Sequence, residues 1–147
     1  MRRDLSFDTE LPYAPPVVWL ALTDPVAISE WLMPIEGFAP VVGAKFTLRG
    51  KPMPGWDGVI EGRILEVEEH RLLSYTWKGT KMRGDTTVRW TLRPLADGAG
   101  THLRLDHRGF EGFGGTLMSF MHRGGWQKFL HRTLPAYLAH HEAGSEA

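Results

Sequence analysis

The stretch Thr-Thr-Val-Arg-Trp-Thr-Leu-Arg, residues 86–93, alternates between apolar and polar side chains along most of its length. Successive side chains of a β-strand point to opposite faces, so this spacing places Val88, Trp90 and Leu92 together on one face. The opposite face carries the polar set Thr87, Arg89, Thr91 and Arg93. The stretch therefore predicts a strand with one buried face and one solvated face.

The same alternation extends to both sides of this stretch. Residues 101–107 follow a hairpin loop at residues 96–100 and place Leu103, Leu105 and His107 on one face. Further strands are predicted at residues 5–11, 43–49, 58–67 and 72–77. Half-buried strands joined by short loops indicate a curved antiparallel sheet of about six strands, whose dry face needs a cover.

Helical patterns interrupt the strands once and then follow them. Pro15 and the pair Asp24-Pro25 are suited to helix starts, which predicts two short helices after the first strand. Near the C-terminus, apolar residues recur at three-to-four spacing over residues 126–138. A long C-terminal helix with this stripe is the natural cover for the sheet, which makes the predicted fold class α+β.

Two features disturb the pattern of the C-terminal helix. Gly124-Gly125 lowers helix propensity by about 2 kcal/mol. Either the helix starts near Trp126, or one helix begins near Thr116 and carries the glycines where its backbone lies close to the sheet; we favour the second. Pro135 should bend the helix or weaken its last turn.

Composition excludes several classes of protein. A chain of 147 residues suits one domain over residues 1–147, and 17 basic against 17 acidic side chains give no sign of a nucleic-acid partner. Cysteine is absent, so disulfides and thiolate metal sites are excluded. No apolar run of about 18 residues and no signal-peptide pattern occur, which predicts a cytoplasmic protein without a membrane span.

Six motifs follow one another along nearly the whole chain. They are residues 17–31, 58–68, 71–77 and 101–110, then the pairs Gly125-Trp126 and Tyr137-Leu138. In this order they resemble the START-like superfamily of helix-grip domains. More narrowly, the chain resembles proteins similar to the C-terminal domain of the activator of heat-shock protein 90 ATPase. The resemblance implies a curved sheet that grips the C-terminal helix, with an apolar cavity between them.

The resemblance leaves three functions open, because members of the superfamily include lipid carriers, polyketide cyclases and aromatases, and co-chaperones. The first is binding of a small hydrophobic or amphipathic ligand. The second is a polyketide cyclase/aromatase-like enzyme, and the third is protein interaction, with heat-shock protein 90 or as a homodimer. A genuine co-chaperone has an additional N-terminal domain, for which this chain has no room, so we expect ligand binding.

The candidate ligand-binding residues are those whose side chains should face the cavity. The aromatic ones either line it or only fill the core, and His107 is either a polar anchor at its mouth or a histidine satisfied by backbone. Glu61 and Arg63 either point inward as a head-group site, or Gly62 shifts the register and both face water. The full set is Glu61, Tyr75, Trp77, Trp90, Leu105, His107, Trp126, Phe129 and Leu130.

Two loops and the remaining polar residues complete the predictions. Trp56 and Asp57 belong to a loop that either caps the cavity or forms a tight turn, and residues 109–115 form either a hinged lid or an ordinary crossover. Arg89, with Arg93 and Arg104, should lie on the solvated convex side of the sheet. We expect no catalytic residue and no cofactor, and the seven histidines are not spaced as metal ligands.

Overall fold

The computed structural model describes residues 4–146, apart from residues 55, 81, 83 and 111–120. The strands are β1 (Leu5–Leu11), β2 (Ile35–Glu36), β3 (Lys45–Arg49), β4 (Val59–Glu68), β5 (Leu72–Gly79), β6 (Thr86–Pro94) and β7 (Thr101–Arg108). The helices are α1 (Pro15–Thr23), α2 (Pro25–Trp31), residues 121–128, a π-helical turn (Phe129–Thr133) and α4 (Leu134–Glu146).

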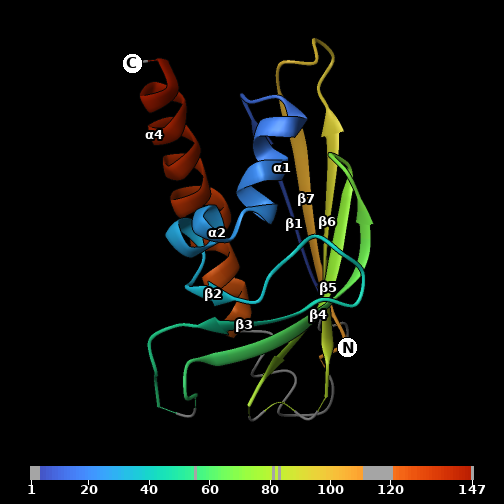
Figure 1. The fold of residues 1–147 in the computed structure, drawn as a ribbon, viewed down its shortest axis with the longest axis vertical. Coiled ribbons are helices and arrows are strands. Elements are labelled where there is room, and N and C mark those ends of the chain that lie inside the picture. Colours follow the sequence, from blue (N-terminus) through green and yellow to red (C-terminus); the bar gives the residue numbers. More distant parts are fainter. Residues whose placement is uncertain (1–3, 55, 81, 83, 111–120, 147) are drawn as a thin grey trace.

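The strands form one seven-stranded antiparallel sheet in the order β1-β7-β6-β5-β4-β3-β2. Figure 1 shows this sheet curving beside the C-terminal helix, with α1 and α2 on the same side of the sheet as that helix. The predicted α+β helix-grip fold is therefore confirmed. The strand that the sequence pattern missed is β2, because its two residues are too few to show an alternation.

Local chemistry sets the two short helices as predicted. Pro15 occupies the start of α1, and the Asp24 carboxylate accepts a hydrogen bond of 3.1 Å from the backbone N–H of Val26 at the start of α2. The buried indole of Trp31 then donates to the Ala21 carbonyl at 2.7 Å. These bonds fix the corner between α1 and α2, which packs beside the C-terminal helix.

The C-terminal helix runs through the glycine pair. Residues 121–128 are helical, so a start near Trp126 is wrong, while the predicted start near Thr116 lies outside the described residues. The predicted close approach to the sheet is also wrong. Among the described residues, a Cβ atom at Gly124 would meet nothing within 4 Å, and one at Gly125 would meet only the ring of Phe129, at 3.8 Å.

The turn before Pro135 is π-helical. The backbone N–H of Leu134 donates to the carbonyl of Phe129, five residues earlier, and the Thr133 hydroxyl donates to the carbonyl of Trp31 at 2.7 Å. Proline has no N–H, and its ring clashes with the carbonyl four residues before it. The wider turn accommodates this disruption, so the helix continues past the proline into α4.

The two faces of the sheet differ as the alternation predicts. Val88, Trp90 and Leu92 are buried on the inner face, whereas Arg89 and Arg93 are exposed on the outer face. Within the described part of the chain, no helix is both long and apolar enough to cross a membrane.

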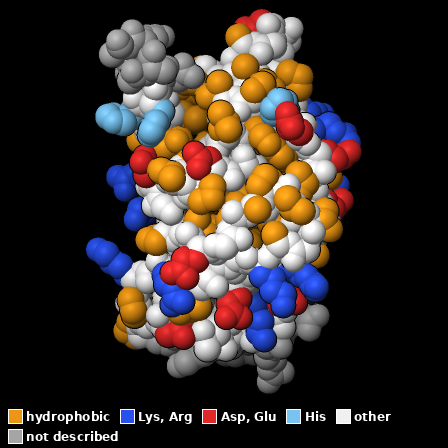
Figure 2. All heavy atoms as spheres, viewed as in Figure 1, with side chains coloured by type: hydrophobic (Ala, Val, Ile, Leu, Met, Phe, Trp, Pro, Cys, Tyr) orange, Lys and Arg blue, Asp and Glu red, His pale blue; other side chains and the backbone are white. Residues whose placement is uncertain are grey.

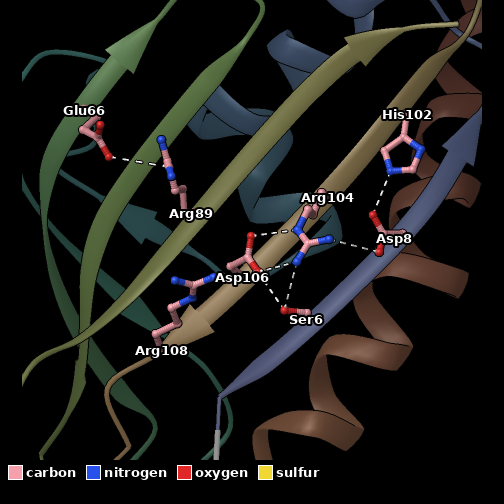
Figure 3. A network of polar contacts seen from close by, with 8 residues as sticks. All are labelled: Ser6, Asp8, Glu66, Arg89, His102, Arg104, Asp106 and Arg108. Atoms are coloured by element: carbon pink, nitrogen blue, oxygen red, sulfur yellow. Dashed lines mark hydrogen bonds and ion pairs between the residues drawn. The ribbon is translucent and has the colours of Figure 1, made fainter.

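A polar network covers the outer face near β1 and β7 (Figure 3). Asp106 accepts hydrogen bonds from Arg104 at 3.0 Å and from Ser6 at 2.7 Å, and Asp8 accepts one of 2.7 Å from His102. Burial acts to raise the pKa of Asp106, but the hydrogen bonds from Arg104 and Ser6 and the charges of Arg104 and Arg108 outweigh it and lower that pKa. The network therefore ties β1 to β7 on the side away from the helix.

Candidate functional site

A pocket of about 820 Å³ opens between the C-terminal helix and the lower part of the sheet. It is lined by the end of α2 with the turn after it, the β3–β4 connection, the end of β5 and the helix before the π-helical turn. Figure 2 shows charged side chains gathered over the lower part of one face, around β2 to β4, with hydrophobic side chains more frequent above them. Pockets that hold small molecules measure roughly 300–1,000 Å³, so this one is large enough for such a ligand.

The lining of the pocket is mostly apolar and rich in methionine. All four methionines of the described part of the chain lie there: Met33, Met53, Met82 and Met121. The aromatic part of the lining consists of Trp56, Trp77, Trp126 and Phe129. Methionine side chains are unbranched and polarisable, so a wall made of them can adjust to ligands of different shape.

Glycines create space in two of the pocket walls. Gly125 lines the pocket, and within the described part of the chain a Cβ atom there would meet only Phe129 within 4 Å. On the opposite wall, a Cβ atom at Gly50 would lie 2.9 Å from the Met33 sulfur and 3.0 Å from the Trp56 ring. The glycine in the helix thus leaves part of the pocket empty, while Gly50 lets Met33 and Trp56 pack over its backbone.

Some of the predicted aromatic residues line the pocket, and the others lie in the packed core next to it. Trp77, Trp126 and Phe129 line the pocket. Tyr75 and Trp90 lie outside the lining and are buried, with the Trp90 indole donating to the Tyr75 hydroxyl at 2.9 Å. Burial raises the pKa of Tyr75 far above its ordinary value, so this phenol stays protonated. The predicted residues Leu105 and Leu130 are likewise core residues.

His107 is fully buried rather than at the mouth of the cavity. Its Nδ1 atom accepts from the Trp126 indole at 2.9 Å, because an indole N–H can only donate. The proton of the neutral ring is therefore on Nε2, which donates to the Thr86 hydroxyl at 2.7 Å, and that hydroxyl donates to the Trp77 carbonyl at 2.6 Å. Side chains, and not the backbone, satisfy this histidine.

The environment of His107 keeps its ring neutral. Burial, and then the neighbouring His122, lower its pKa well below the ordinary value. The rings of Trp77, Trp126, Phe110 and His122 surround it at centroid distances of 4.5–6.0 Å. A neutral histidine with both nitrogen atoms engaged is a packing element, and it has no lone pair or proton left for a ligand.

Glu61 does not belong to the pocket. It is exposed with Arg63 on the outer face of β4, so of the two alternatives the inward head-group site is wrong, and the prediction that both side chains face water is confirmed. The predicted register shift at Gly62 is also absent: β4 keeps one pairing with β5 from Ile60 to Ile64, and the shift falls between Ile64 and Glu66.

The inner face of β4 explains why Glu61 points outward. Ile60, Gly62 and Ile64 are buried there. A Cβ atom at Gly62 would overlap the ring of Phe46 and the carbonyl of Thr76, so only glycine fits at this inward position.

The predictions for two loops, the one with Trp56 and Asp57 and the one at residues 109–115, are tested to different extents. Trp56 lines the pocket and donates to the Val59 carbonyl at 3.2 Å, and the Asp57 carboxylate accepts from the Val59 N–H at 3.0 Å, which makes the segment both a turn and a wall. The proposed lid at residues 109–115 lies largely outside the described residues, and Phe110, which is described, is buried against His107.

The polar side chains of the lining are few. His122 accepts a hydrogen bond of 3.0 Å from the Trp77 indole, and Ser29 lies at the end of α2. Arg49, Lys51 and Lys128 complete the set, and all three are exposed, so they stand at the rim. Among the described residues, no three His, Asp or Glu side chains are placed to hold a metal ion.

Sequence reasoning missed the methionines, His122 and the cations at the rim. The methionines come from loops and segment ends, where no periodic pattern indicates which side chain faces inward. His122 precedes the apolar stripe from which the helix was predicted. The Gly124-Gly125 pair was the one sequence feature that could have indicated the pocket. Glycines lower helix stability, so a glycine pair inside a helix indicates a role other than helix formation.

A seven-stranded antiparallel sheet that grips a C-terminal helix over an apolar pocket defines the class of START-like helix-grip proteins. Within that class, residues 12–139 match the family described as activator of Hsp90 ATPase homolog 1-like protein. The chain belongs to this family. No curated protein matches it.

Solved structures agree with this assignment. Protein MLL2253 from Mesorhizobium loti is 30% identical with a TM-score of 0.80, over 93% of this chain and 97% of that chain. CalU16 from Micromonospora echinospora is 25% identical with a TM-score of 0.75, over 92% and 75%. PFC0360w, described as an HSP90 activator from Plasmodium falciparum, is 22% identical with a TM-score of 0.69, over 87% and 91%, which is a likeness of fold alone.

Proposed function

We propose that this protein binds a small hydrophobic or amphipathic molecule in the pocket between the sheet and the C-terminal helix. The observation that carries the proposal is an apolar cavity of about 820 Å³ whose walls are built from methionine and aromatic side chains. Burial of apolar surface contributes roughly 25 cal/mol per Å², so such walls supply the driving force for binding without any specific polar contact.

The chemistry of the lining favours binding over catalysis. Proton transfer by a pair of groups needs two titratable side chains that converge on the substrate. Among the described lining residues, His122 is the one histidine and no aspartate or glutamate is present, and the Nε2 atom of His122 already accepts a hydrogen bond from Trp77. The titratable members of the predicted ligand-binding set, Glu61, Tyr75 and His107, are not among the described lining residues. The enzyme, heat-shock protein 90 and homodimer alternatives remain predictions from the resemblance.

The adjacent glycines of the helix provide a matched test of the pocket. Gly125→Leu places a side chain into the pocket, whereas Gly124→Leu places one on the exposed side of the same helix, with open space around its Cβ position. Both changes improve helix propensity, by about 1 kcal/mol each, so neither variant should be destabilised.

Binding is measured with the neutral fluorescent probe N-phenyl-1-naphthylamine, and native mass spectrometry of the purified protein identifies any co-purified molecule. We expect Gly125→Leu to abolish probe binding and Gly124→Leu to retain the wild-type affinity. If the wild-type protein does not bind the probe and carries no ligand, or if both variants bind equally well, the pocket is not the binding site.

A further inference from the structure

The charged side chains among the described lining residues of the pocket are all basic. Arg49, Lys51 and Lys128 line it, and no aspartate or glutamate occurs among the lining residues that the structure describes. The whole chain, in contrast, carries equal numbers of acidic and basic side chains. All three cations are exposed residues, so their aliphatic stems contribute to the wall while their charged ends stay in water.

Two carboxylates on the neighbouring segments already have partners. Glu36 on β2 forms a 3.3 Å ion pair with the Nε atom of Arg49, and no other hydrogen bond of this guanidinium occurs among the described residues. Asp57 accepts from the Thr80 hydroxyl and from the Val59 backbone N–H.

The two lysines differ from Arg49 because neither of them forms an ion pair within the described part of the chain. Lys51 follows β3, and Lys128 ends the helical segment before the π-helical turn, so they approach the pocket from different segments.

We propose that the ligand is an amphipathic anion, with a flexible apolar chain against the methionines and a carboxylate or phosphate group at the rim between Lys51 and Lys128. This inference rests on the proposed function and adds the chemical class of the ligand. The apolar part explains the methionine wall, because a flexible chain needs a surface that can adapt. The anionic end explains why the charged side chains among the described lining residues are all cations.

The test compares four molecules with the same ten-carbon chain, each titrated into the full-length protein by calorimetry below its micelle concentration. Decanoate and decyl phosphate carry anionic ends, decanol a neutral end and decyltrimethylammonium a cationic end. We expect both anions to bind more tightly than the ammonium compound, and their affinity to fall as sodium chloride is raised, because salt screens exposed charges. A preference between the two anions distinguishes a carboxylate ligand from a phosphate ligand.

Paired variants assign the effect to the rim. The double variant Lys51→Gln with Lys128→Gln should weaken decanoate binding by about two- to fivefold for each lysine and leave decanol binding unchanged. The control is Lys45→Gln with Lys78→Gln, which removes the same charge from exposed positions outside the lining and should bind decanoate like the wild type.

The outcomes distinguish failure of the anionic ligand class from failure of the hydrophobic pocket itself. If decanol binds and the ammonium compound binds as well as decanoate, or if the two double variants behave alike, the anion is wrong and the hydrophobic pocket stands. If none of the four molecules binds, the proposed function is overturned as well.

Discussion

Trp90 and Trp56 lie in the same interior between the sheet and the helix, but their surroundings differ. Trp90 is 1% exposed, donates to Tyr75, and packs edge-on against Trp31 and Trp126. Trp56 comes from the β3–β4 connection, is half-buried, and faces the pocket beside Met33. The first indole belongs to a closed core and the second to an open wall.

This difference shows how one interior can serve both stability and binding. In the described core, every buried polar side-chain atom has a hydrogen-bond partner, and the ring of His107 is held at both nitrogen atoms. Around the pocket, the walls come from loops and carry flexible thioethers. A rigid, satisfied core supports a region that keeps its adaptability, so changes in the two regions should affect different measurements.

The largest expected effect comes from removing the two indoles in turn. Trp90→Ala should lower the free energy of unfolding by about 3–5 kcal/mol, because it opens a large cavity in a packed core and leaves Tyr75 without its partner. Trp56→Ala should cost less than half of that, since its side chain is partly solvated. Urea unfolding of both variants measures the difference. If both variants lose the same free energy of unfolding, Trp56 belongs to the packed core and not to an open pocket wall.

A smaller effect should follow from pH. The folded protein keeps His107 neutral because its pKa is lowered, whereas the unfolded chain binds a proton there below about pH 6.5. The unfolded state then binds more protons, so stability is full above that pH and falls below it, by about 1.4 kcal/mol per pH unit. His107→Gln, which can still accept from Trp126, should lose this slope between pH 5 and 6.5.

The control for the pH effect is His140→Gln, because His140 is exposed on α4 and its replacement should keep the wild-type slope. Unfolding free energies measured at several pH values test all three proteins. If the curves of wild type and His107→Gln run parallel, the histidine is not held neutral by its burial.

The smallest effect on stability is expected at the pocket wall. Met53 is 51% exposed, so Met53→Ala should change the free energy of unfolding by no more than about 0.5 kcal/mol. The same variant should weaken binding of the neutral probe by about three- to tenfold, which corresponds to about 0.7–1.4 kcal/mol. Leu20→Ala, at a 62% exposed position outside the lining, should change neither quantity, and an equal loss of binding there would contradict a local role for Met53.

The fold was predictable because strand alternation and helix periodicity are local properties of the chain. The inward set Val88, Trp90 and Leu92 follows directly from period-two spacing, and the structure buries all three. On β4 the same reasoning failed, because the inward position 62 is a glycine that makes room for Phe46. A glycine contributes nothing to a hydrophobic pattern. The pattern alone therefore does not show which face of β4 Glu61 occupies, and only the packing around Gly62 does.

The site was predictable only where it belongs to regular elements. Trp77 on β5 and Trp126 and Phe129 on the helix follow from periodicity and do line the pocket. Met53 and Trp56 come from an irregular connection, and their direction depends on contacts between segments far apart in the chain. Whether an inward aromatic side chain meets a core or a pocket depends on what lies opposite, as the contrast between Trp90 and Trp126 shows.

The π-helical turn at Phe129–Thr133 has a geometric consequence for the helix on either side of it. An extra residue in one turn rotates the following side chains by about 100° relative to a regular α-helix. The helix before the turn presents Gly125 and Trp126 to the pocket, as does Phe129 at the start of the turn, whereas α4 after the turn packs against α1 and α2. The turn thus sets the angle between two surfaces of one helix. The direction of the side chains that face the pocket is therefore not tied to the direction of the α4 side chains that pack against α1 and α2.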